Sequence, residues 1–195
     1  MLHFIAALFL SIGSLFHGHA TDYTRMVDRV QSSIVRIEIH SSEGSGRCSG
    51  FVVQSHIVLT ANHCTDGDLV VDGVPASLIK RDGENDLAIL YVSTGKPSLS
   101  FRLTPVVRFE ILTSIGYGYG LHTLTPLQNR VIMVNGDLES DGIPKGIIVA
   151  PGYIGGMSGG PVVDASGLVV GIIQRGSAQI GYGVPVSVIL SFLGA

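Results

Sequence analysis

The feature that most constrains the fold of this 195-residue chain is a long series of short apolar runs separated by turn signals. In one run, Val35, Ile37 and Ile39 alternate with polar residues, which is typical of a strand with one buried face. Many short strands at this spacing indicate an all-β sandwich or barrel. The expected strands are 35–39, 49–53, 57–60, 69–71, 76–80, 86–92, 111–115, 124–128, 131–134, 146–150, 160–163, 168–174 and 181–184.

Turn and helix signals divide this series. Turns are expected at Glu43-Gly44-Ser45-Gly46, Asp72-Gly73, Asp82-Gly83, Asn135-Gly136, Asp141-Gly142 and Ser166-Gly167. Residues 93–105 are richer in Ser, Pro and Gly, and we interpret them as a linker between two halves. One helix is expected near the end of the chain, at 186–193, because Pro185 precedes it and Gly194 follows it.

Composition excludes some classes of function. The chain is 46% hydrophobic and only 14% charged, which favours a globular protein over a disordered one. Its formal net charge is −3 and it contains no basic run, so binding to nucleic acid through phosphate neutralisation is not expected.

The first twenty residues contain no Asp, Glu, Lys or Arg, and 2–16 are nearly all apolar. That run is short for a membrane span, and Gly18-His19-Ala20 supplies the small residues that a signal peptidase requires. We interpret 1–20 as a signal peptide cleaved after Ala20, which predicts a secreted or periplasmic protein without a stable membrane span after cleavage. An uncleaved anchor or a buried helix remains the alternative.

Two cysteines, Cys48 and Cys64, are present. An even number in an exported chain favours one disulfide bond. The alternative is a pair of unrelated buried thiols.

Ser158 lies within the heptapeptide Gly155-Gly156-Met157-Ser158-Gly159-Gly160-Pro161. Glycines allow backbone conformations in which N–H groups turn inward, where they can stabilise an oxyanion during acyl transfer. On its own the segment could also be an ordinary Gly-Ser turn, which is the less favoured interpretation.

Two upstream residues complete a possible catalytic set. His63 follows the expected strand 57–60, and Asp86 begins the apolar run 86–92. A serine hydroxyl needs a base to accept its proton, and histidine suits that role because its pKa is near neutrality. A carboxylate on the other ring nitrogen then fixes the tautomer. The histidines lack the spacing of a zinc site, so neither a metal nor another cofactor is expected.

Three segments carry a resemblance to a known family: Thr60-Ala61-Asn62-His63-Cys64, Asn85-Asp86-Leu87-Ala88-Ile89-Leu90 and the heptapeptide around Ser158. In this order they resemble the chymotrypsin-like serine proteases of the trypsin superfamily. The similarity is greatest to compact bacterial HtrA-type protease domains without a PDZ domain, and it extends from about residue 30 to the end.

The resemblance implies a fold and a domain organisation. It implies a trypsin-like protease domain over 21–195, built from two six-stranded antiparallel β-barrels and a short C-terminal helix. Barrel 1 is expected at about 30–92 and barrel 2 at about 106–185, with the linker 93–105 between them and the helix at 186–193. It also implies a Cys48–Cys64 disulfide, since the family often bridges the cysteine after the histidine to the preceding strand.

The resemblance also implies the role of each site residue. His63 would be the general base, Asp86 would orient it and Ser158 would attack the peptide carbonyl, while the N–H groups of Gly156 and Ser158 would form the oxyanion hole. The substrate would be a protein or peptide. Its extended chain would pair with Gln174, Arg175 and Gly176, and Gly183 and Gly152 would border the pocket for the residue before the cut.

Two positions depart from the digestive members of the family. Met157 replaces the aspartate that pairs with a newly cut N-terminus, so we expect no activation switch of that kind. Gly152 occupies the position where trypsin-like members have a selective aspartate. We therefore expect an apolar residue before the cut rather than Lys or Arg.

Two other functions are compatible with parts of the sequence. A non-catalytic binding protein on the same fold is the main alternative, although inactive relatives usually lose a triad residue and this chain has all three. An esterase would fit Gly156-x-Ser158-x-Gly160, but that class needs an alternating α/β chain with its histidine last.

Overall fold

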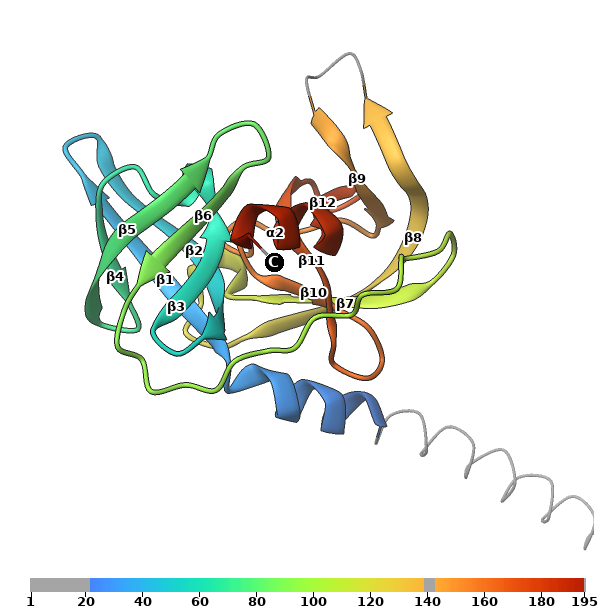
Figure 1. Cartoon of the computed structure of the whole chain (residues 1–195), viewed down its shortest axis with the longest axis horizontal. Coiled ribbons are helices and arrows are strands. Elements are labelled where there is room, and N and C mark those ends of the chain that lie inside the picture. The colour runs from blue at the N-terminus through green and yellow to red at the C-terminus, as the bar shows by residue number, and fades with distance from the viewer. Residues whose placement is uncertain (1–21, 139–142, 195) are drawn as a thin grey trace, which may run out of the picture.

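Antiparallel strands make up most of the molecule. The computed structural model describes residues 22–138 and 143–194, and Figure 1 shows their arrangement. In these residues the first six strands form one closed barrel in the order β1-β2-β3-β6-β5-β4. They are β1 Ile34–Ser41, β2 Gly44–Gln54, β3 Ile57–Ala61, β4 Asp68–Val71, β5 Val74–Asp82 and β6 Leu87–Tyr91.

The remaining strands form a second closed barrel, in the order β10-β11-β12-β9-β8-β7. They are β7 Ile111–Gly116, β8 Thr125–Leu138, β9 Ile143–Ala150, β10 Pro161–Val163, β11 Val169–Gly176 and β12 Gly181–Pro185. The short helix α2, Val186–Leu193, follows β12 directly. The expected fold class, two six-stranded antiparallel barrels with a short C-terminal helix, is confirmed.

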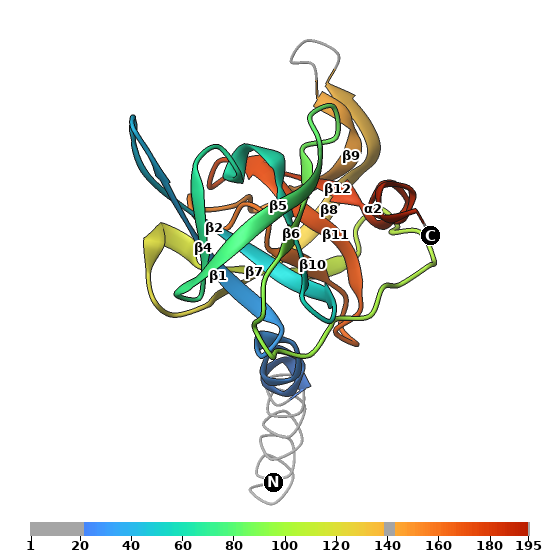
Figure 2. The same ribbon diagram turned by 60° about the vertical axis from the view of Figure 1, so that its left-hand side comes forward.

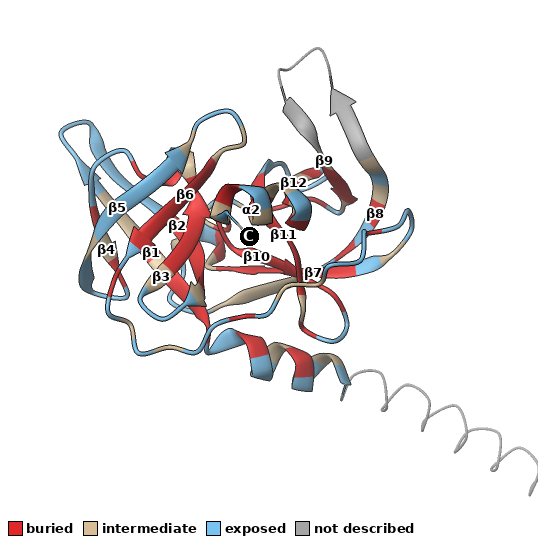
Figure 3. Ribbon diagram, in the orientation of Figure 1, coloured by how far each residue is buried: buried red, intermediate tan, exposed pale blue. Residues whose placement is uncertain are grey.

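A shared apolar core joins the barrels. Ile34 and Val35 are adjacent in β1 and both fully buried, because Ile34 faces the core between the barrels and Val35 the interior of barrel 1. Phe51 from barrel 1 and Ile172 from barrel 2 belong to the same shared core, together with Phe192 of α2. Burying one such side chain contributes about 1.5–3 kcal/mol, so the two barrels stabilise each other. In Figure 3 the buried residues, in red, lie on strands of both barrels, on the N-terminal helix and on α2.

The C-terminal helix closes the interface from one side. Val186, Ile189 and Phe192 are its buried residues. Gly194 ends the helix in the left-handed conformation with φ 81°, and its N–H donates to the carbonyls of the last turn. Lys80 of β5 donates a 2.6 Å hydrogen bond to the carbonyl of Phe192, which connects barrel 1 to this helix.

The structure contains a helix that the sequence analysis did not predict. Residues 22–31 are helical and lie beneath the barrels in Figures 1 and 2. Met26 and Val30 are buried in the shared core, and Tyr23 and Val27 pack against it. This spacing is typical of one helix face, but it spans only four apolar residues next to a much longer series of strand patterns.

Two expected turns are wrong. β2 begins at Gly44, so the turn expected at Glu43–Gly46 lies earlier, at residues 42–43. The expected strands 124–128 and 131–134 belong to the single strand β8, which continues through Asn135-Gly136. The pairing of β8 with β9 shifts register on both sides of Gly136. A glycine inside a strand often marks such a bulge, which bends the strand without ending it.

The predicted signal peptide at 1–20 and the turn at Asp141-Gly142 fall outside the described residues. Among the residues that are described, no helix has the length and apolarity needed to cross a membrane.

Candidate active site

His63 and Asp86 are brought together by two paired strands. Ala61 of β3 is opposite Leu87 of β6, so the residues beyond these positions are neighbours. His63 lies in the short 3-10 helix η1, Asn62–Cys64, which continues from β3. The Asp86 carboxylate accepts two hydrogen bonds from His63: one from its backbone N–H at 2.9 Å and one from ring nitrogen Nδ1 at 2.8 Å.

This pairing determines which nitrogen of His63 can act as a base. When Nδ1 carries the proton donated to Asp86, the lone pair is on Nε2. The His63 side chain is 47% exposed and the Asp86 side chain only 16%, so the imidazole is accessible while the carboxylate is sheltered. Asp86 has a φ of 55°, a region that non-glycine residues seldom occupy, so its conformation depends on these contacts.

Barrel 1 holds the loop that carries Ser158. The backbone N–H of Ser49, in β2, donates to the Ser158 carbonyl at 2.8 Å. The Ser49 hydroxyl donates to the Gly156 carbonyl at 2.8 Å and accepts from the Tyr117 N–H at 2.8 Å. Ser49 is fully buried, so these bonds are shielded from water.

Gly159 allows this close approach. A Cβ at residue 159 would lie 2.2 Å from the Thr60 hydroxyl and 2.3 Å from the Ser49 carbonyl. The backbone of Gly159 also has a φ of +81°. The Thr60 hydroxyl in turn donates to the Ser49 carbonyl at 2.8 Å. Sequence reasoning missed Ser49 and Thr60, although two polar residues inside apolar strands were a signal that could have identified them.

The peptide plane between Gly155 and Gly156 has a fixed orientation. The Gly155 carbonyl accepts a 2.7 Å hydrogen bond from the N–H of Tyr119, in the 3-10 helix η2, Gly118–Gly120. Because a trans peptide is planar, the Gly156 N–H points the opposite way. No hydrogen bond from the N–H of Gly156 or of Ser158 is found within 22–138 and 143–194. Both N–H groups are therefore unpaired among these residues.

Met157 is fully buried and belongs to the core of barrel 2. Its N–H donates to the Ile154 carbonyl at 3.1 Å. The position of the activating aspartate in digestive relatives is thus occupied by a core side chain that carries no charge.

The predicted disulfide is present between Cys48 and Cys64, with their Cα atoms 6.0 Å apart. A ring nitrogen of His63 lies within 4.8 Å of both sulfur atoms. Because both sulfurs are in the disulfide, this group of three side chains has no thiolate to offer a metal.

The expected substrate strand is the end of β11. β10 pairs with β11 only as far as Ile172, whereas β12 pairs with it as far as Gly176. Arg175 and Gly176 are exposed and Gln174 is buried. One edge of Gln174–Gly176 is thus open beside the Ser158 loop, as strand addition by a peptide requires.

A third residue, Tyr153, lies beside the two glycines that are expected to border the pocket, Gly152 and Gly183. A Cβ on Gly152 would lie 2.0 Å from the Ser177 carbonyl, so a larger residue has no room there. Tyr153 is 4% exposed, and its hydroxyl lies 3.3 Å from the position of a Cβ on Gly183. Burial raises the pKa of Tyr153, so this border carries no charge. The signal available in the sequence was an aromatic residue directly after Gly152.

Comparison with known proteins identifies the family. A family model described as a trypsin-like peptidase domain matches residues 48–172. The chain belongs to the trypsin-like peptidases. It is therefore a serine endopeptidase of the chymotrypsin-like class. Residues 48–172 include His63, Asp86 and Ser158.

Solved structures share the fold. The active form of the Rv3671c protease from M. tuberculosis matches with a TM-score of 0.74 at 24% identity, over 87% of this chain and 84% of that one. The HtrA-type protease AlgW, solved with a tripeptide, matches with a TM-score of 0.79 at 24% identity, over 88% of this chain and 62% of that one. A serine endoprotease from Yersinia pestis matches with a TM-score of 0.75 at 20% identity, over 88% of this chain and 65% of that one.

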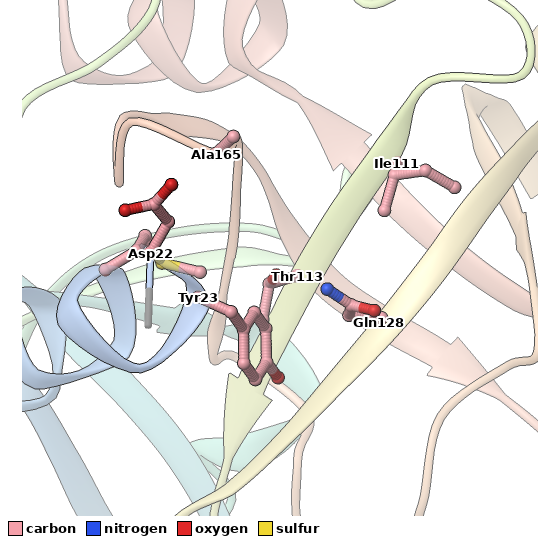
Figure 4. A pocket seen from close by; sticks show the side chains of 7 residues that line it. Asp22, Tyr23, Ile111, Thr113, Gln128 and Ala165 are labelled. Atoms are coloured by element: carbon pink, nitrogen blue, oxygen red, sulfur yellow. The ribbon is translucent and has the colours of Figure 1, made fainter. Parts of the chain in front are cut away.

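A separate cavity of about 420 Å³ lies between the N-terminal helix and barrel 2. Tyr23 of the helix faces Thr113 and Gln128 there, and Ile111 forms its far side (Figure 4). His63, Asp86 and Ser158 do not line this cavity.

Proposed function

We propose that this trypsin-like peptidase cleaves peptide bonds through an acyl-enzyme formed on Ser158. Nε2 of His63 accepts the proton of the Ser158 hydroxyl as its oxygen attacks the carbonyl carbon, and Asp86 stabilises the resulting imidazolium. His63 then donates that proton to the departing amine. A water molecule, deprotonated by the same histidine, releases the acid and restores the serine.

The N–H groups of Gly156 and Ser158 bind the negatively charged oxygen of the tetrahedral intermediate in this proposal. One such donor contributes about 3 kcal/mol to lowering the barrier. The observation that carries the proposal is the pairing of the Asp86 carboxylate with the backbone nitrogen of His63 at 2.9 Å and with its Nδ1 at 2.8 Å. The same molecule has two unpaired N–H groups, at Gly156 and Ser158.

Labelling with a fluorophosphonate probe tests this mechanism. The wild-type protein is expected to react, and Ser158→Ala and His63→Ala are expected to remain unlabelled. Ser187→Ala, which changes an exposed serine of α2, is a matched control that should label normally. Folded wild-type protein that does not label would instead support a binding protein on the same fold.

For specificity, we propose an apolar residue before the cut. The support is the uncharged border of Gly152, Tyr153 and Gly183, with an extended substrate paired along Gln174–Gly176. Cleavage of a peptide library should yield new C-termini that are predominantly apolar. A profile dominated by Lys or Arg would contradict this proposal.

We also propose that the mature domain, 21–195, acts outside the cytoplasm after removal of 1–20. The Cys48–Cys64 disulfide supports this location, because disulfides persist in oxidising compartments. N-terminal sequencing of the exported protein should begin at Thr21, and a sequence that begins at Met1 would refute the cleavage.

A further inference from the structure

An open cavity of about 450 Å³ adjoins the oxyanion loop and has no role in the proposed function so far. It is formed where β2, η2 and the loop before Ser158 meet. Its lining residues are Ser45, Arg47, Tyr119, Gly120, Gly155 and Gly156. Gly156 is thus shared between this cavity and the proposed oxyanion hole, so a substrate held by one is next to the other.

In the proposed mechanism, this cavity lies on the side from which the leaving group departs. Arg47 directly precedes Cys48, whose disulfide is within 4.8 Å of a ring nitrogen of His63. His63 is the group that gives its proton to the leaving amine. The open edge of Gln174–Gly176, in contrast, belongs to β11 and receives the chain before the cut. A chain that leaves past His63 therefore passes along β2 and Arg47.

Arg47 is the one charged residue that lines this cavity, and its charge is not neutralised within the described parts of the chain. Its Nη1 donates to the Gly120 carbonyl at 3.2 Å, which positions the guanidinium. Glu38 is opposite Arg47 on β1, but it pairs with Arg36 at 2.6 Å and lies 3.9 Å from His40. No ion pair of Arg47 occurs in 22–138 or 143–194, and no hydrogen bond from its Nε or Nη2 is found there.

We propose that Arg47 makes this cavity a subsite for a carboxylate within the first two residues after the cut. This inference rests on the proposed function. A guanidinium presents parallel N–H donors that match a carboxylate, and here two of its nitrogens are available. Gly120, Gly155 and Gly156 have no side chains to obstruct the approach. The carboxylate is that of an acidic side chain or of the C-terminus of a short leaving peptide.

Matched peptide substrates test the subsite. Each has the same apolar residue before the cut, and pairs differ only in Glu or Gln at the first or the second position after it. A further pair ends at the second position with a free carboxylate or a carboxamide. For wild type, kcat/KM is expected to be about fivefold higher for the acidic member of at least one pair, and this ratio should fall with added salt.

Substitution of Arg47 identifies the cause of the preference. Arg47→Gln should bring the ratio to about one while hydrolysis of the neutral peptides continues. Arg130→Gln is the matched control: it also removes one exposed positive charge and one hydrogen bond to a backbone carbonyl, and it should keep the wild-type ratio. The Glu pairs and the carboxamide pair together distinguish a side-chain carboxylate from a terminal one.

The possible failures are distinguishable. Wild type that labels at Ser158 and hydrolyses the peptides with ratios near one in every pair would overturn the subsite and leave the proposed function intact. The subsite is overturned in the same way if Arg47→Gln keeps the preference. Wild type that neither labels nor hydrolyses any peptide would overturn the proposed function, and the subsite with it.

Discussion

At the scale of single residues, Asp86 combines an unusual backbone conformation with complete use of its carboxylate. Its φ of 55° is unfavourable for a residue with a side chain, and each carboxylate oxygen accepts one hydrogen bond from His63. An aspartate held in this way contacts both the imidazole and the backbone of His63. Its amide counterpart has only one acceptor oxygen and cannot satisfy both donors.

The substitution Asp86→Asn tests this arrangement. We expect kcat to fall by about 10⁴-fold, because the amide NH₂ group favours the wrong tautomer of His63. Circular dichroism should show a retained fold. Asp68→Asn, which changes an exposed aspartate at the start of β4, should leave kcat unchanged. An Asp86→Asn variant whose kcat is within tenfold of the wild-type value would contradict the orienting role.

Residue patterns indicated the residue types of the candidate site, but not the hydrogen bonds that hold its loops in place. The types and order of His63, Asp86 and Ser158 follow from short motifs that can be recognised locally. The hydrogen-bond partners of Ser49 and Tyr119 could not be identified in that way, because they are distant in the chain: the Ser49 hydroxyl and the Gly156 carbonyl are 107 residues apart. Such contacts become apparent only when the barrels are assembled.

At the scale of elements, the segment between β6 and β7 is fixed to barrel 2 by a charged cluster. Arg102 of this segment pairs with Glu110 at 2.5 Å and with Asp164, after β10, at 3.3 Å. Glu110 also accepts the Val107 N–H at 3.1 Å. The pKa of Glu110 lies below its ordinary value of 4.5, mainly because its carboxylate accepts hydrogen bonds from Arg102.

This lowered pKa predicts a pH-dependent contribution to stability. A carboxylate whose pKa is lower in the folded state stabilises fully above its unfolded pKa, near 4.5, and loses this contribution as the pH falls through the folded value. Wild type should therefore have a higher free energy of unfolding than Glu110→Gln at pH 7, with the difference shrinking below about pH 4.5. Urea unfolding across this range measures it. Glu84→Gln, at an exposed position, should show no such trend.

The elements were predicted unevenly for a physical reason. Alternating apolar residues identified most strands, since period-two burial is encoded locally. The N-terminal helix has a local pattern as well, but its four apolar residues were outweighed by the surrounding strand signals. Asn135-Gly136 was interpreted as a turn because the dipeptide favours one. Pairing with β9 instead keeps β8 extended, with a bulge at that point.

At the scale of the whole molecule, the proposed active site belongs to neither barrel alone. Barrel 1 supplies His63 and Asp86, barrel 2 supplies Ser158, and Ser49 connects them through two hydrogen bonds to the Ser158 loop. The shared core then keeps both halves in one orientation. Catalytic geometry and stability should therefore change together when this connection is altered.

The substitution Ser49→Ala tests the connection. It leaves the Gly156 carbonyl and the Tyr117 N–H without their buried partner, which should lower the free energy of unfolding by about 1–3 kcal/mol. We expect kcat to fall as well, because the oxyanion loop is less well held. Ser41→Ala, which removes an exposed hydrogen bond to the Gly44 carbonyl, is the matched control. Equal unfolding and activity of the two variants would argue against this role for Ser49.

The tight fit at Gly159 also limits how this sequence can vary. A side chain at 159 would overlap the Thr60 hydroxyl and the Ser49 carbonyl, so it could enter only if the opposite barrel changed in compensation. Barrel 1 therefore restricts residue 159 across a large separation in the sequence. A library that varies residue 159, alone or together with residues 49 and 60, should return few functional members besides glycine, because the Ser49 carbonyl belongs to the backbone and φ at 159 is +81°.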